Sequence, residues 1–340
     1  MTEDILIRKA GRAGRITLNR PQALNALSHA MALAVEAALD AWRDDPAVAL
    51  VVIDAAGDRA FCAGGDLAEI YADGRRGDFD KPRRFWADEY RMNAKIAAYP
   101  KPYVALTQGH VLGGGVGVAL HGSHRIVGDT SKVAMPECLI GLVPDVGGTH
   151  LLGQAPGRLG EYLGLTGHRM GPGEAIHAGF ADAYVPEADW PALVARLEAA
   201  GDPGVIADFA KAPPPSTLAP LQAEIDAAFA APDLPTLIAR LEPSDWGAKV
   251  AAGLAGQSPL SMACTLALVR AARAEPGVAP ALTREYRFTA RSMEFGDLME
   301  GIRAQVIDKD RRPLWPDAID SLSGERVAAM LAPLPRDWPL

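Results

Sequence analysis

The sequence predicts an α/β fold that continues into a helical C-terminal region, and three observations predict it. Two continuous apolar runs, Ala49–Ile53 and Pro102–Thr107, are typical of strands that are buried on both faces. Each run leads into a glycine-rich loop, and the repeated order of strand, loop and helix favours parallel pairing. After about residue 200, strand signals stop and Ala/Leu/Arg-rich segments with helical periods follow. We therefore predict an α/β core over residues 1–200 and a helical region over residues 201–340.

The remaining elements follow from local patterns. Ser28 is a plausible N-cap of a helix, because apolar residues recur at helical spacing from Met31 to Trp42. That helix should end near Asp45–Pro46. Further strands are expected at Ile5–Ile7, Arg15–Leu18 (paired with the first around the turn Gly11–Gly14), Arg125–Val127 and Lys132–Ala134, and further helices at Leu260–Ala274 and Leu282–Met293.

Composition excludes several classes of protein. The chain has 340 residues, of which 49% are hydrophobic and 22% charged, which is ordinary for a globular protein. The net charge of −8 argues against general nucleic-acid binding, which needs concentrated Lys and Arg. The three cysteines, Cys62, Cys138 and Cys264, form no CxxC pair, which fits a reducing compartment and gives no metal signal. We see no signal peptide and no membrane span, so we expect a cytoplasmic protein with neither nucleic-acid nor membrane partners.

Two glycine-rich loops are candidates for chemistry. They are Phe61–Leu67 (FCAGGDL) and Leu112–Gly117 (LGGGVG). Glycine lets backbone N–H groups approach a ligand closely, so two facing loops could direct two donors at one oxygen as an oxyanion hole. The alternative is a pair of tight turns needed only for packing. The glycine spacing matches neither GxGxxG nor a phosphate-binding GK[ST] loop.

Two carboxylates follow in an apolar setting. Glu137 and Asp145 lie within Ala134–His150 (AMPECLIGLVPDVGGTH), each directly after a proline. Burial would raise a carboxyl pKa and would make the group a better acid or base at neutral pH. The alternative is a surface Glu137 and an Asp145 that only caps a helix over Val146–Leu152.

Taken together, these segments resemble the crotonase (enoyl-CoA hydratase/isomerase) superfamily. The resemblance runs through TLNRPQALNAL, AFCAGGDL, KPYVALTQGHVLGGGVGVALHG and MPECLIGLVPDVGGTHLL. The segments EYRMN, SPLSMACT, EYRFTARSM and EGIRAQVIDKDRRPLW are similar to the branch of 3-hydroxyisobutyryl-CoA hydrolases. The ordered set is far more specific than any one motif.

The resemblance implies a fold and a site. The fold is a crotonase-like spiral of repeated ββα units with a helical C-terminal region. The backbone N–H groups of Gly65 and Gly114 would hold the thioester oxygen, and Glu89 would contact substrate. The residues implied to line the path of CoA are Asn25, Ala26, Leu27, Ala63, Gly64, Asp66 and Lys309. No cofactor is expected, since CoA is part of the acyl-CoA substrate, and no metal is required.

The acids distinguish the branches. Enoyl-CoA hydratases typically use two glutamates, and this chain has Gly117 where the first would stand. Glu137 matches the second, and Asp145 stands where hydratases usually have a small residue. The hydrolase branch keeps this Glu and this Asp, so the resemblance implies thioester hydrolysis with Glu137 as nucleophile or general base. Asp145 would orient the substrate hydroxyl or Glu137, or handle the proton delivered to the thiolate.

Several alternatives remain open at this point. An enoyl-CoA hydratase or isomerase could use Glu137 alone or with Asp145, and a silent acyl-CoA-binding protein would need neither acid. A thioesterase of the same branch could act on another short acyl group. A Cys138–His110 pair lacks an orienting third group, and a metal at His121 and His124 lacks further ligands. Self-association into a homo-oligomer is also left open, because crotonases often form trimers.

Overall fold

The computed structural model describes residues 3–339, and the chain divides into two compact units. Unit 1 comprises Met1–Gly65, Asp88–Ala134 and Arg169–Ala219; unit 2 comprises Asp66–Ala87, Met135–His168 and Pro220–Leu340. Each unit is assembled from segments that are far apart in the sequence. The boundary predicted near residue 200 separates two continuous segments, whereas each of these units combines three. That boundary stays a prediction.

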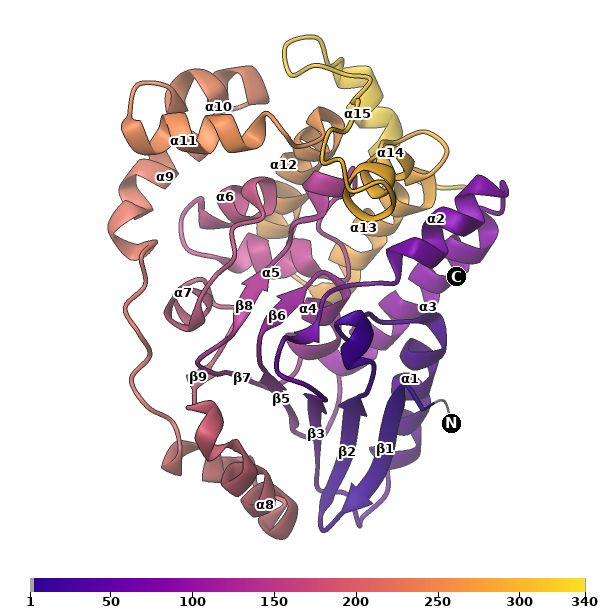
Figure 1. The fold of residues 1–340 in the computed structure, drawn as a ribbon, viewed down its shortest axis with the longest axis vertical. Coiled ribbons are helices and arrows are strands. Elements are labelled where there is room, and N and C mark those ends of the chain that lie inside the picture. Colours follow the sequence, from indigo (N-terminus) through magenta and orange to yellow (C-terminus); the bar gives the residue numbers. More distant parts are fainter. Residues whose placement is uncertain (1–2, 340) are drawn as a thin grey trace. The chain divides into compact units, whose positions relative to one another are not determined.

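Unit 1 contains both sheets (Figure 1). The larger has six strands in the order β1-β2-β3-β5-β7-β9; its first pair is antiparallel and every later pair is parallel. The smaller sheet joins β4, β6 and β8 in parallel. The strands are β1 (Ile5–Ala10), β2 (Ala13–Leu18), β3 (Leu50–Ala55), β4 (Ala60–Cys62), β5 (Tyr103–Thr107), β6 (His110–Leu112), β7 (His124–Val127), β8 (Lys132–Ala134) and β9 (Ala183–Tyr184).

Helices supply the rest of both units. Those of unit 1 are α1 (His29–Arg43), α4 (Gly114–Ala119), α7 (Pro172–His177) and α8 (Trp190–Ala200), with η1 (Pro21–Ala23), η3 (Glu187–Asp189) and η4 (Pro203–Asp208). Those of unit 2 are α2 (Leu67–Arg75), η2 (Glu137–Ile140), α5 (Gly148–Gln154), α6 (Leu159–Thr166), α9 (Gln222–Phe229), α10 (Leu234–Leu241), α11 (Asp245–Leu254), α12 (Pro259–Ala274), α13 (Val278–Ser292), α14 (Leu298–Ile302), η6 (Arg303–Ile307) and α15 (Gly324–Leu331). The division between the units falls within α3 (Asp80–Ala97) and at η5 (Ala219–Leu221).

The predicted α/β class is confirmed, and so are most of its elements. Ser28 caps α1 by accepting a hydrogen bond from Met31 N at 3.3 Å. The runs at Ala49–Ile53 and Pro102–Thr107 form β3 and β5. The sequence interpretation missed β4 and β6, which end inside the two glycine-rich loops, at Cys62 and Leu112. Both strands are three residues long and run directly into glycine-rich sequence, which is typical of loops.

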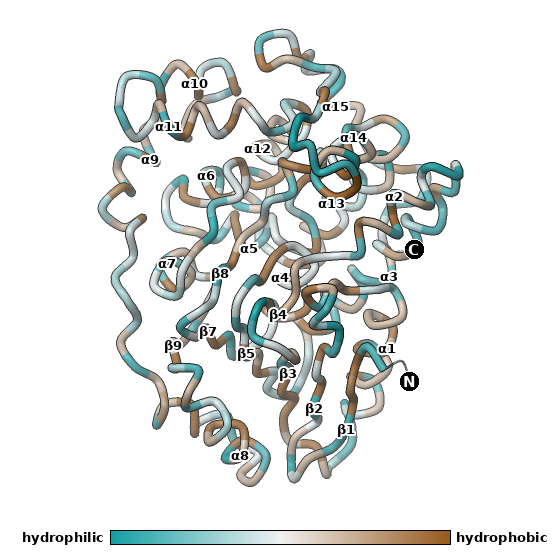
Figure 2. Tube along the Cα trace, viewed as in Figure 1, coloured by the Kyte–Doolittle hydropathy of each residue, from teal (hydrophilic) through white to brown (hydrophobic). Residues whose placement is uncertain are grey.

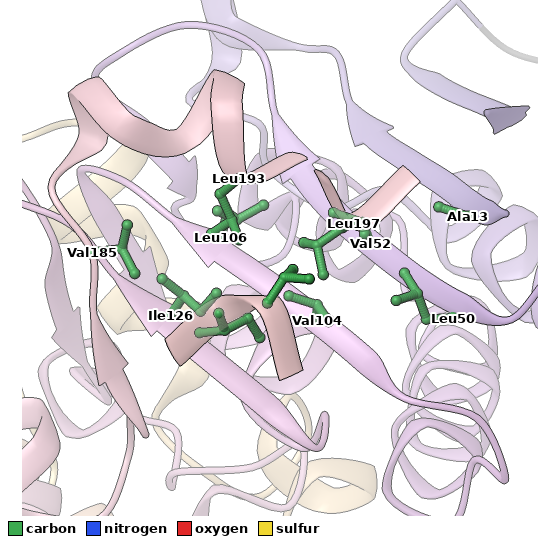
Figure 3. Close-up of a cluster of buried hydrophobic side chains, with 11 residues drawn as sticks. Ala13, Leu50, Val52, Val104, Leu106, Ile126, Val185, Leu193 and Leu197 are labelled. Carbon is green, nitrogen blue, oxygen red and sulfur yellow. The ribbon is translucent and has the colours of Figure 1, made fainter. Parts of the chain in front are cut away.

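One hydrophobic cluster of unit 1 lies on one face of the larger sheet and includes residues of β3, β5 and β7. The trace of β3 is largely in hydrophobic colours (Figure 2). Leu193 and Leu197 of α8 cover that face near Leu106 and Val52 (Figure 3). Burial of both faces accounts for the continuous apolar runs, because a strand covered on two sides has no solvent-facing positions.

Within residues 3–339, no single helix is long and apolar enough to cross a membrane. Helices α11 and α12 reach the necessary length and hydropathy only in combination, and the chain bends by 114° between them.

The packing of β2 against α1 yields a test. A Cβ atom at Gly14 would lie 2.4 Å from Trp42 Cε3, and Trp42 is buried. We expect Gly14→Ala to lower the free energy of unfolding by about 1–3 kcal/mol, because the indole cannot move aside without disturbing the core. Urea unfolding measures this. Gly253→Ala is the control, since Gly253 lies in α11 with no atom within 4 Å of an added Cβ, and it should leave stability unchanged or raise it. Equal unfolding midpoints for Gly14→Ala and wild type would contradict this packing.

Candidate active site

Unit 1 brings the two predicted glycine loops together. A Cβ atom at Gly114 would lie 3.4 Å from Gly65 N and 2.9 Å from Glu89 Oε1. Gly64 has φ of +107°, and Gly113 has φ of +48°, so both loops need backbone angles that side chains rarely tolerate. Within residues 3–339, the structure shows no hydrogen bond donated by the amide of Gly65 or of Gly114. Gly65, Gly114 and Glu89 are called the glycine-loop site below.

The neighbouring chain segments are tied to these loops by hydrogen bonds. Leu27 N donates to Gly64 O at 2.8 Å, and Ala63 N donates to Leu24 O at 3.0 Å. Asn25 has φ of +54° and is buried; its Nδ2 donates to two backbone carbonyls and its Oδ1 accepts from a backbone amide. Asn25 therefore holds the loop in shape. The predicted contacts of Asn25, Ala26, Leu27, Ala63 and Gly64 with CoA stay predictions.

Helix α3 contributes two buried polar side chains to unit 1. Glu89, 2% exposed, reaches Gly114 as described above. Asn93, one helical turn later, is fully buried, and neither its Oδ1 nor its Nδ2 has a hydrogen-bond partner among residues 3–339. Sequence reasoning missed Asn93, although its spacing of four from Glu89 places both on the same helix face.

Unit 2 holds the two predicted acids. Glu137 begins η2 and is 5% exposed, and its Oε2 is buried without a hydrogen-bond partner in the described part of the chain. Burial raises the pKa of Glu137 well above its ordinary value of 4.5, and the negative charges of Asp145 and Glu285 raise it further. Glu137 thus favours its protonated form up to an unusually high pH, as a tuned acid or base requires. Glu137, Asp145 and Glu285 are called the carboxyl cluster.

Asp145 sits in a constrained turn. Its carbonyl accepts from Gly148 N at 2.6 Å, and the next two residues, Val146 and Gly147, have φ of +53° and +80°. A left-handed conformation costs an L-residue about 1–2 kcal/mol, and a β-branched residue tolerates it poorly. The predicted helix start at Val146 is wrong, because positive φ angles are not helical, and α5 begins only at Gly148. Asp145 is not the N-cap either, since Gly147 occupies that position.

Glu285 of α13 performs the capping instead. Its Oε2 accepts from Gly147 N at 2.7 Å and its Oε1 from Thr149 N at 2.9 Å, and Oε1 also accepts from the Thr149 hydroxyl. Glu285 is fully buried, which raises its pKa to about 7, while these hydrogen bonds oppose the shift. Sequence reasoning missed its role, although the EYRFTARSM segment that contains it was part of the resemblance.

The remaining sequence candidates have other surroundings. The Cys138 thiol lies 3.4 Å from Gly164 O and 3.3 Å from Thr265 Oγ1, and burial raises its pKa to about 12, so it is a poor nucleophile at neutral pH. His124 begins β7 and bonds Ser123, so it shares no helix face with His121.

Two residues predicted to contact CoA belong to unit 2. Asp66 is the N-cap of α2, and its side chain accepts from Glu69 N at 3.4 Å. Lys309 has φ of +58° and follows η6, between two aspartates that both pair with Arg303. Their predicted roles toward CoA stay predictions.

Comparison with known proteins places this chain in a family. The model of the enoyl-CoA hydratase/isomerase family matches residues 13–331. The 3-hydroxyisobutyryl-CoA hydrolase of Gallus gallus, named as mitochondrial, is 36% identical over 97% of this chain and 89% of its own length. A probable 3-hydroxyisobutyryl-CoA hydrolase of Arabidopsis thaliana is also 36% identical, over 95% of this chain and 90% of its own.

Solved structures agree on the fold. An enoyl-CoA hydratase from Rhodobacter sphaeroides is 54% identical with a TM-score of 0.93, and the match covers 97% of this chain and 98% of that one. A carnitinyl-CoA dehydratase from Mycobacterium thermoresistibile is 41% identical with a TM-score of 0.95, covering 99% and 98%. The chain belongs to the enoyl-CoA hydratase/isomerase family, and it has the crotonase fold that the motifs predicted.

The raised pKa of Glu137 predicts how stability changes with pH. The folded state holds this proton at pH values where the unfolded chain has lost it, so stability falls as pH rises from about 4.5 toward the folded pKa. Glu137→Gln removes this penalty and should raise the free energy of unfolding at pH 8 by about 1–3 kcal/mol, with a smaller gain at pH 4.5.

Denaturant unfolding at both pH values measures the effect, and Glu161→Gln is the matched control. Glu161 is also fully buried in unit 2, but it pairs with Arg158 at 2.8 Å and Arg273 at 2.9 Å. Its replacement should destabilise, because a buried carboxylate loses two charge-assisted hydrogen bonds to partly exposed arginines. A Glu137→Gln protein that is less stable than wild type at pH 8 would show that burial and the neighbouring acids do not disfavour the ionised form of Glu137.

Proposed function

We propose that this chain is an acyl-CoA thioester hydrolase and that 3-hydroxyisobutyryl-CoA, an intermediate of valine breakdown, is its substrate. The observation that carries the proposal is the pattern of acids. Gly117 replaces a hydratase glutamate, whereas Glu137 and Asp145 are both present and both buried in unit 2. The names of the relatives that span nearly the full chain support the same reaction.

The proposed mechanism begins with a polarised carbonyl. The amides of Gly65 and Gly114 donate to the thioester oxygen, which gains negative charge as the carbonyl carbon is attacked. Glu137 acts as a carboxylate in one of two ways. It attacks the carbonyl carbon, which releases the CoA thiolate and leaves an anhydride for water to cleave, or it takes a proton from a water molecule that attacks in its place.

The other two acids have supporting roles in this scheme. Asp145 orients Glu137 or the substrate 3-hydroxyl, or passes a proton to the departing thiolate. Glu89, buried beside Gly114, binds the acyl group. Because Glu137 and Asp145 interact through their charges, they titrate as a pair. No cofactor or metal enters the scheme, and that expectation stays part of the proposal.

Enoyl-CoA hydration is the second candidate, and a specific observation favours it. The Rhodobacter sphaeroides structure, which is 54% identical, is described as an enoyl-CoA hydratase. The proposed hydrolase agrees better with the acids, since a hydratase of the usual kind needs a carboxyl group where Gly117 has no side chain. The mitochondrial names of several relatives give no support to the cytoplasmic prediction. The homo-oligomer and the absence of membrane and nucleic-acid partners stay predictions.

Release of free CoA from 3-hydroxyisobutyryl-CoA, followed with a thiol reagent, tests the proposal. We expect steady thiol release by wild type and a loss of at least about 10²-fold in kcat for Glu137→Gln, because the carboxylate is the attacking group or the base. Asp145→Asn should lose roughly 10-fold or more. Crotonyl-CoA absorbance is followed in parallel, and Gly253→Ala serves as a variant that should retain full activity.

Each other outcome has one meaning. Loss of crotonyl-CoA absorbance without free thiol would replace the hydrolase with the hydratase. Thiol release from isobutyryl-CoA as fast as from 3-hydroxyisobutyryl-CoA would show that the 3-hydroxyl is not recognised. CoA binding without turnover of any substrate would reduce the protein to an acyl-CoA carrier.

The pH dependence of kcat/KM provides a separate prediction. Because Glu137 must lose its proton to act, and its pKa is raised well above 4.5, kcat/KM should still be rising with pH above pH 5 and should level off only beyond the pKa of the carboxyl pair. Rates from pH 4.5 to 9 measure this limb. A plateau already reached at pH 5 would mean that the ionised form of Glu137 is not disfavoured before substrate binds.

A further inference from the structure

The turn that carries Asp145 is held by a residue from a distant part of the chain. Glu285 lies 138 positions after Gly147, yet its carboxylate binds the amides of Gly147 and Thr149 and the Thr149 hydroxyl. These contacts follow directly on Val146, whose left-handed conformation is one that a β-branched residue avoids. The hydrogen bonds to Glu285 therefore hold a turn that the local sequence does not favour.

A simple cap would not need this arrangement. A Ser or Asp at the N-cap position would satisfy the Thr149 amide from within the turn, without burying a distant carboxylate. Glu285 is instead fully buried next to two other acids, and its charge opposes the ionisation of Glu137. A costly group that persists beside candidate catalytic residues indicates a functional constraint.

The other charged groups on the surrounding helices are directed elsewhere. Helices α5, α12 and α15 pack against α13. On α5, His150 accepts a hydrogen bond from a backbone amide, and on α15, Arg326 binds Asp317. On α12, Arg273 binds Glu161, and Arg270 donates to backbone carbonyls. On α13 itself, Arg284 binds Glu275, Arg287 binds Asp337, and Arg291 donates to backbone carbonyls. The negative charge of Asp145 raises the pKa of Glu285, and the charges of Glu285 and Glu137 oppose one another.

We propose that Glu285 is a positioning residue of the thioesterase: its carboxylate fixes the turn over residues 144–149 and thereby sets where Asp145 stands relative to Glu137. This inference rests on the proposed function. Glu285 does not touch the reacting atoms; it acts through Asp145 and through the charge that it adds to the carboxyl cluster. Its loss should therefore change the rate and the pH dependence of the reaction more than the binding of acyl-CoA.

The test compares Glu285→Gln with wild type in the thiol-release assay. The amide cannot accept from both backbone N–H groups, so the turn loosens, and kcat should fall roughly 10- to 100-fold while KM changes by less than about threefold. Loss of a nearby negative charge makes Glu137 easier to ionise, so the rising limb of the pH profile should move to lower pH.

Thr149 gives an independent approach to the same contact. Thr149→Val removes the hydroxyl that binds Glu285 and should lower kcat, whereas Thr149→Ser keeps the hydroxyl and should restore kcat to within about twofold of wild type. Glu161→Gln is the control for loss of a buried carboxylate in unit 2: its melting temperature should fall while its kcat and pH limb stay those of wild type. All assays are run below the lowest melting temperature in the set.

The outcomes separate the two proposals. If wild type releases no thiol, the proposed function fails, and the role of Glu285 in a thioesterase fails with it. If wild type is active and Glu285→Gln is folded with unchanged kcat and an unmoved pH limb, Glu285 only caps α5 and the inference is overturned. If Thr149→Ser is as slow as Thr149→Val, the hydroxyl contact is not what positions the turn, which also overturns it.

Discussion

The burial of three carboxyl groups in one region is the constraint on which unit 2 depends. The charges that shift the pKa of Glu137 are those of Asp145 and Glu285, and both act against its ionisation. Like charges in a low-dielectric interior disfavour one another's ionisation, which adds to the effect of burial on the pKa of Glu137. Hydrogen bonds from a turn hold Glu285, while Glu137 keeps an oxygen without a partner within residues 3–339. The cluster thus contains one acid whose oxygens both accept hydrogen bonds and one acid that keeps an oxygen without a partner among the described residues.

Unit 1 holds hydrogen-bond donors where unit 2 holds buried acids. There, two backbone amides at Gly65 and Gly114 lie close together and donate no hydrogen bond among residues 3–339. Left-handed glycines shape both loops, and hydrogen bonds between the Leu24–Leu27 and Ala63–Gly64 segments brace one of them. Unpaired donors stabilise a developing oxyanion, and buried acids supply or remove protons. Thioester hydrolysis uses both kinds of group.

Much of this was predictable from sequence, and the misses have physical causes. Buried parallel strands appear as continuous apolar runs, so β3 and β5 were found, whereas the short strands β4 and β6 run directly into glycine-rich sequence that is typical of loops. The motifs identified Glu137, Asp145, Gly65 and Gly114 as candidates. Glu285 and Asn93 were missed because a helix-borne Glu or Asn looks solvent-exposed until the packing is known. The start of α5 was misplaced because a distant carboxylate, rather than a local side chain, satisfies its first amides.

Overall identity and local chemistry point in different directions in this family. The chain is more similar to a structure described as an enoyl-CoA hydratase than to relatives named as hydrolases, at 54% against 36% identity. Identity over a whole chain is dominated by positions that build the core, and one core can support several reactions. The reaction depends on a few groups instead. Adding water across a double bond requires a carboxyl group at the position of Gly117 in the usual hydratase arrangement, and glycine offers none. Hydrolysis requires a polarised carbonyl and one attacking or activating carboxylate, and this chain retains candidates for both. The acids therefore weigh more than the identity in choosing between the two reactions.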